Sequence, residues 1–192
     1  MTAESHIESY LTELKKSIDA LSKDKFKAIA DALLAAYRAG RHVFVMGNGG
    51  SAATASHMAC DLAKGTVMPG KKRFKVICLS DSIPLITAWA NDTSYDSIFS
   101  EQLDNLVSAG DVVIGISGSG NSPNVLNALK LARARKAKTV GLTGFSGGRM
   151  KDLCDICLIV PSDSMQRIED AHLIIEHALY SYIKEKLGDG NV

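Results

Sequence analysis

The most restrictive feature of the sequence is an ordered repeat of an apolar β-rich run, a polar turn and a helix. Five such runs are present, at residues 42–46, 74–80, 111–117, 138–144 and 155–161. Parallel strands need long crossovers and are buried on both faces, so the repeat predicts an α/β three-layer sandwich with a five-stranded parallel sheet flanked by helices. With 192 residues, 46% of them hydrophobic, the chain suits one well-buried core.

The same pattern predicts the domain organisation. A single domain is expected over residues 1–192, with N-terminal helices in 1–40, the parallel-sheet core in 41–165 and a C-terminal helix in 166–187. The first helix is apolar on one face only, and the rest of the domain offers it no evident partner. We therefore expect the N-terminal helix to pack in an oligomer.

Charge and hydropathy exclude several kinds of partner. Lys and Arg number 22 and Asp and Glu number 21, so the net charge of +1 gives no broad basic field for nucleic acid. No segment approaches the roughly 18 continuous apolar residues that span a bilayer, and the start carries no basic stretch followed by an apolar run. We expect a cytoplasmic protein that binds a small molecule, with no nucleic-acid or membrane partner.

The sharpest motif is SGSGNS at residues 117–122, directly between an apolar strand and a helix. Ligands of parallel sheets bind at the carboxyl ends of strands, where this motif lies. Ser117, Ser119 and Ser122 offer hydroxyl donors, Gly118 lets the backbone approach a ligand, and the helix N-terminus favours an anion. The motif predicts a phosphate site, and the alternative is an ordinary loop with a serine N-cap.

A second glycine-rich loop also joins a strand to a helix. Its sequence, GNGGS, lacks the third glycine of a dinucleotide fingerprint, and no acidic residue ends a following strand at the expected place. A nicotinamide cofactor is therefore not expected. Asn48 and Ser51, with the backbone at Gly49 and Gly50, better suit the polar floor of a sugar site.

Ionisable side chains on two helices form a further candidate site. The helix after the second loop carries His57 and Asp61 four residues apart, on one face. The final helix carries four more such residues: Glu169, His172, Glu176 and His177. Imidazoles and carboxylates from two helices suit a borderline metal ion or an acid/base pair, whereas an isolated His/Asp pair is more often a local hydrogen bond.

Five segments carry a family resemblance, in order and with similar spacing: GNGGSAATASHMACDL, ANDTSYDSIFSEQL, GDVVIGISGSGNSPNVLNAL, GLTGFSGG and RIEDAHLIIEH. They resemble the sugar-isomerase (SIS) family and, more narrowly, the phosphoheptose isomerases. Those enzymes interconvert sedoheptulose 7-phosphate and D-glycero-D-manno-heptose 7-phosphate. Their members are homotetramers with a zinc ion in active sites between subunits, and their product feeds heptose biosynthesis for lipopolysaccharide and other surface glycans.

The resemblance implies roles for individual residues. It implies a phosphosugar site made by Asn48, Gly49, Gly50, Ser51, Asp92, Ser117, Gly118, Ser119, Ser122 and Glu169. It implies a zinc site made by His57, Asp61, Glu169 and His177. Asp61, His177 and Glu169 are the expected catalytic groups of an aldose–ketose isomerisation through an enediol. His172 lies outside the family's set, and its position is compatible with facing the metal, a neighbouring subunit or a serine hydroxyl.

Four departures from the family pattern leave two alternatives open. Asp61 stands where the family has glutamate, Glu169 where it has glutamine and Gly118 where it has threonine, and the arginine after the His57 helix is missing. One alternative is an isomerase of a hexose or pentose phosphate. The other is a non-catalytic SIS protein, similar to the tetrameric factor that binds the bacterial replication initiator.

Overall fold

The computed structural model describes residues 2–189. Its centre is a sheet of five parallel strands in the order β2-β1-β3-β4-β5. The strands are β1 (His42–Gly47), β2 (Lys75–Cys78), β3 (Val112–Ser117), β4 (Lys138–Thr143) and β5 (Ile156–Ile159). All five coincide with the predicted β-rich runs, so the predicted α/β fold is confirmed.

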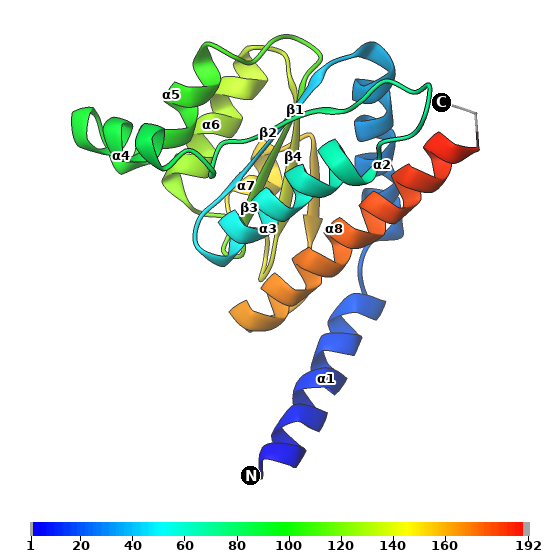
Figure 1. The fold of residues 1–192 in the computed structure, drawn as a ribbon. Coiled ribbons are helices and arrows are strands. Elements are labelled where there is room, and N and C mark those ends of the chain that lie inside the picture. Colours follow the sequence, from blue (N-terminus) through cyan, green and yellow to red (C-terminus); the bar gives the residue numbers. More distant parts are fainter. Residues whose placement is uncertain (1, 190–192) are drawn as a thin grey trace.

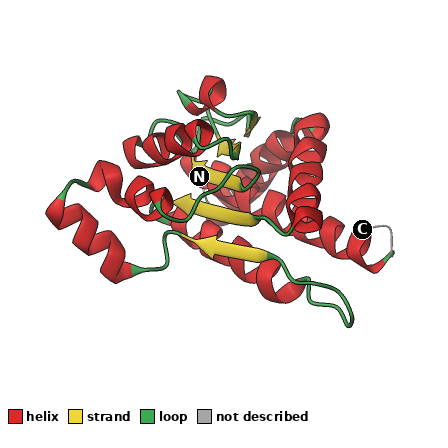
Figure 2. Cartoon of the chain, turned by 90° about the horizontal axis from the view of Figure 1, so that it is seen from above, coloured by secondary structure: helices red, strands yellow, loops and turns green. Residues whose placement is uncertain are grey.

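Side chains alternate between the two faces of the sheet and define the layers. In β1, Val43 and Val45 join one buried cluster, whereas Phe44 and Met46 join the other. One face is covered by α2 (Lys23–Ala39), α3 (Gly50–Cys60) and α8 (Met165–Gly188). The opposite face is covered by α4 (Ile83–Asp92), α5 (Ile98–Asp104), α6 (Pro123–Ala134) and α7 (Met150–Leu153). Figures 1 and 2 show the sheet between these two helical layers.

The first helix, α1 (Ala3–Asp19), extends away from the body of the fold (Figure 1). The prediction that it lacks a partner within its own domain is wrong, because α1 contacts α8 and the Tyr10 hydroxyl donates a hydrogen bond to Asp170. The contact covers only part of the helix. Ile7 remains 51% exposed and Leu11 55% exposed, so α1 keeps an apolar surface.

The strand order reverses between β1 and β3. From β1 the chain passes to β2 on one side, and it then returns to form β3 on the other side and continues outward through β4 and β5. The loops that follow β1 and β3 therefore flank the crevice where parallel sheets bind ligands. No helix in residues 2–189 is long and apolar enough to cross a membrane.

Candidate functional site

A cavity of about 270 Å³ opens at this reversal of strand order. Its lining comes from the loops after β1 and β3 and from the first turn of α8: Asn48, Gly49, Gly50, Ser51, Ile116, Ser117, Gly118, Ser119, Ser122, Met165 and Glu169. Every residue predicted to contact a phosphosugar lines this cavity, with the exception of Asp92. That residue lies exposed at the end of α4, where it accepts a hydrogen bond from the Asn91 amide.

The serine loop presents polar groups to the cavity. The hydroxyl oxygens of Ser117 and Ser122 lie 3.0 Å apart, and Ser119 Oγ accepts a hydrogen bond from the Asn121 backbone. Ser122 is the N-cap of α6, yet its hydroxyl makes no capping hydrogen bond to that helix. Hydroxyl donors beside a helix N-terminus form an anion site, because the amide groups of the first turn and the helix dipole both favour negative charge.

Asn48 holds the two loops together. Its Nδ2 donates to Asn124 Oδ1 at 2.9 Å, and Asn124 Nδ2 donates back to Asn48 Oδ1 at 3.0 Å. Tyr95, in the 3₁₀ turn η2 (Tyr95–Ser97), donates its hydroxyl to the same Oδ1. Asn124 and Tyr95 were not among the predicted site residues. The one available signal was that Asn124 is a polar residue in the first turn of the helix that follows the serine loop.

Glu169 reaches the cavity from α8 and lies against the first turn of α3. A Cβ atom placed on Gly50 would come within 2.6 Å of its carboxylate, so only glycine leaves room for this contact. The N-terminus of α3 carries a partial positive charge, which stabilises the carboxylate there. On the other side, Met165 lies over Gly118, where an added Cβ would meet its sulfur. Met165 was not among the predicted site residues.

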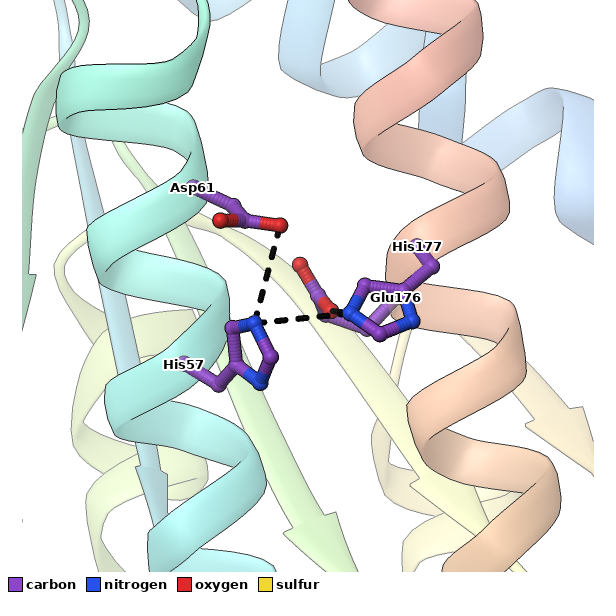
Figure 3. A group of neighbouring side chains, drawn as sticks. All are labelled: His57, Asp61, Glu176 and His177. Atoms are coloured by element: carbon purple, nitrogen blue, oxygen red, sulfur yellow. Dashed lines mark hydrogen bonds and ion pairs between the residues drawn. The ribbon is translucent and has the colours of Figure 1, made fainter.

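A second group of ionisable side chains lies between α3 and α8 (Figure 3). His57 and His177 approach with their Nε2 atoms 3.4 Å apart. The Asp61 carboxylate lies 3.8 Å from His57 Nε2, and the Glu176 carboxylate lies 3.5 Å from His177 Nε2. One ligand atom from each residue falls within 4.8 Å of all the others. We call these four residues the His–carboxylate cluster.

The Glu176 carboxylate is buried. The residue is 1% exposed, and within residues 2–189 neither carboxylate oxygen has a hydrogen-bond partner. Burial and, to a smaller extent, the nearby charge of Asp61 together raise the pKa of Glu176 from 4.5 to about 7. Buried charges are normally paired or bound to a metal, so this carboxylate needs a cation or a proton.

The cluster has the composition and spacing of a metal site. Zinc binds imidazole nitrogen and carboxylate oxygen at about 2.0–2.2 Å in tetrahedral geometry, which sets ligand atoms about 3.4 Å apart. The nearest contacts in the cluster, at 3.4, 3.5 and 3.8 Å, are close to that value. These donors therefore fit a divalent ion of the zinc type.

Three of the four predicted metal ligands meet in this cluster: His57, Asp61 and His177. Glu169 does not belong to it. Seven residues separate Glu169 from Glu176 on α8, which is about 10 Å along the helix axis. The assignment of Glu169 as a ligand therefore stays a prediction.

His172 faces neither the cluster nor the serine loop. Its ring is 1% exposed, and Nε2 donates to the Thr143 carbonyl oxygen at 3.1 Å. Burial lowers the pKa of His172 from 6.5 to about 4. The side chain is therefore a neutral core histidine that ties α8 to the end of β4.

A serine-rich loop beside a helix N-terminus, at the reversal of strand order in a parallel sheet, suits the class of proteins that bind phosphorylated small molecules. Residues 8–144 match the family described as the SIS domain. A phosphoheptose isomerase from Pelobacter propionicus is 39% identical over 187 residues, covering 94% of this chain and 98% of that protein. A phosphoheptose isomerase from Aliarcobacter butzleri is 44% identical over 148 residues, which cover 77% of this chain and 78% of that protein.

A solved structure of a relative has a closely similar fold. The phosphoheptose isomerase from Francisella tularensis has a TM-score of 0.89 at 31% identity, and the match covers 97% of this chain and all of that one. The chain belongs to the phosphoheptose isomerase family of SIS-domain proteins.

Proposed function

We propose that this chain interconverts D-sedoheptulose 7-phosphate and D-glycero-D-manno-heptose 7-phosphate. The observation that carries the proposal is the cavity itself, which combines an anion-binding serine loop with the Glu169 carboxylate in a chain of this family. Isomerisation moves a proton between C1 and C2 through an enediol and needs a base, an acid and stabilisation of the developing oxyanion.

The serine loop would bind the phosphate. Hydroxyls of Ser117, Ser119 and Ser122 donate hydrogen bonds, and the N-terminus of α6 supplies the favourable dipole. The described part of the lining contains no lysine or arginine, so neutral donors carry the recognition. Asn48, Gly49, Gly50 and Ser51 form the floor beneath the sugar, and Asp92 remains a proposed contact from outside this lining.

The catalytic groups are proposed as follows. Glu169 borders the cavity and takes the proton from C1, the C–H electron pair forms the enediol, and the proton returns at C2. His177 and Asp61, which lie in the His–carboxylate cluster and outside the described lining of this cavity, are the other two groups proposed for proton transfer.

A zinc ion is proposed at the His–carboxylate cluster. His57, Asp61 and His177 would hold it. When bound, zinc supplies Lewis-acid polarisation to a carbonyl that reaches it.

We further propose a cytoplasmic homotetramer with active sites between subunits. The exposed apolar residues Ile7 and Leu11 on α1 support burial of that helix in an assembly. Sedimentation equilibrium at micromolar concentration tests this, with the double variant Ile7→Ser/Leu11→Ser expected to lower the assembly state. A monomeric wild-type protein would contradict the proposal.

The substrate is tested by turnover on a panel of seven-, six- and five-carbon ketose phosphates. The proposal expects the highest kcat/KM for the heptose, and large losses for Glu169→Gln and His177→Ala. Ser119→Ala should mainly raise KM. A higher kcat/KM for a hexose or pentose phosphate would show that such a sugar, and not the heptose, is the substrate. Binding without turnover of any sugar would favour a non-catalytic SIS protein.

A further inference from the structure

We propose that Glu176 is a metal ligand in this chain, completing the set made by His57, Asp61 and His177, while Glu169 serves the substrate cavity. The inference extends the metal part of the proposed function. It concerns binding and not turnover, so it stands or fails separately from the isomerase activity.

Helix geometry separates the two glutamates. Glu169 and Glu176 lie on the same face of α8 because seven residues make nearly two whole turns. On α3, Gly50 and His57 have the same seven-residue separation. Toward the N-terminal ends of the two helices, Glu169 lies against Gly50. Two turns further along, Glu176 and His177 meet His57 and Asp61, as Figure 3 shows.

Two glycines let side chains of α8 lie close to the backbone of α3 and of the turn that follows it. Gly50 accommodates the Glu169 carboxylate at one end, and Gly65 accommodates the Tyr180 ring at the other, where an added Cβ would lie 2.6 Å from the ring. Gly65 ends the π-helical turn η1 (Asp61–Gly65), which begins at the cluster residue Asp61. Single π-turns within helices are frequent at functional sites.

The environment of Glu176 favours a cation. Both of its carboxylate oxygens are buried, and among the described residues neither accepts a hydrogen bond or pairs with a lysine or arginine. A buried carboxylate in this state is strongly destabilising unless it binds a cation or a proton. Asp61 and Glu176 together carry two negative charges, which a divalent ion neutralises. Two imidazoles and two carboxylates suit zinc and related ions.

The test is zinc binding by the metal-stripped full-length protein, measured by competition with a chromophoric chelator. Glu176→Gln should weaken zinc binding by about tenfold or more, as expected for loss of a ligand. Glu169→Ala is the control, two turns away on the same helix face, and it should stay within about twofold of wild type. Alanine removes every possible ligand atom, whereas glutamine is the residue of the family at this position. Asp61→Asn is the positive control.

A second readout uses Co²⁺ in place of zinc. Loss of a ligand should alter the visible absorption of the Co²⁺ form in Glu176→Gln, whereas the absorption of Glu169→Ala should equal that of wild type. Circular dichroism checks that each variant folds. Unchanged zinc affinity and Co²⁺ spectrum in folded Glu176→Gln, or loss of zinc in Glu169→Ala alone, would overturn the proposal whatever the turnover of the wild type.

Discussion

Replacing Glu176 by glutamine should make the metal-free protein more stable, and by an amount that depends on pH. The Glu176 carboxyl is buried beside Asp61, and its pKa rises from 4.5 to about 7 on folding. The folded state therefore holds a proton that the unfolded state releases. Any stability from this group is present below pH 4.5 and is lost as pH rises through 7.

The size of the effect follows from the shift. Each pKa unit corresponds to 1.36 kcal/mol, so the raised pKa of Glu176 lowers the free energy of unfolding by about 3 kcal/mol at pH 8 and by about 1 kcal/mol at pH 5. Glutamine has no charge to bury. The gain in stability of Glu176→Gln over wild type should therefore grow by about 2 kcal/mol between pH 5 and pH 8.

Urea unfolding at several pH values, with a chelator present, measures this difference. Other titrating groups cancel between the two proteins, and Glu169→Gln serves as the partly exposed control. Added zinc should narrow the difference at pH 8, because tenfold tighter binding stabilises wild type by about 1.4 kcal/mol more than the variant. A stability difference that does not change with pH would refute the reasoning.

Three further predictions concern neighbouring positions. Gly50→Ala should displace the Glu169 carboxylate, because the new Cβ would lie 2.6 Å from it. We expect kcat to fall about tenfold or more with little change in Tm. Unchanged kcat would count against Glu169 as the base. Gly118→Ala should push Met165 from its place and raise KM for the sugar phosphate, and adding Met165→Ala should restore KM if steric contact is the cause. His172 has a pKa lowered to about 4, so its stability contribution is present above pH 6.5 and falls by about 2 kcal/mol from pH 7 to pH 5. His172→Gln should remove this loss in urea unfolding, and an equal acid sensitivity in both proteins would contradict it.

The parallel sheet could be predicted because its signals are local. Alternation in β1 sends Val43 and Val45 to one face and Phe44 and Met46 to the other, and each apolar run ends in a polar turn. The serine loop was predictable for the same reason, since strand, loop and helix N-terminus are contiguous in the chain.

The members of the His–carboxylate cluster were harder to assign. Spacing placed His57 and Asp61 on one face of a helix, but their partner depends on where α8 lies against α3. Glu169 and Glu176 occupy the same face of α8, so helical periodicity makes them equally good candidates for the partner of His57 and Asp61. The Gly50 contact with Glu169 and the burial of Glu176 distinguish them, and both arise from tertiary packing.

The single most direct test of the proposed function is NMR of sedoheptulose 7-phosphate incubated with the wild-type protein, in parallel metal-stripped and zinc-loaded samples. We expect conversion to D-glycero-D-manno-heptose 7-phosphate, with the faster rate in the zinc-loaded sample. No conversion in either sample, with the protein folded and the sugar phosphate bound, would contradict it.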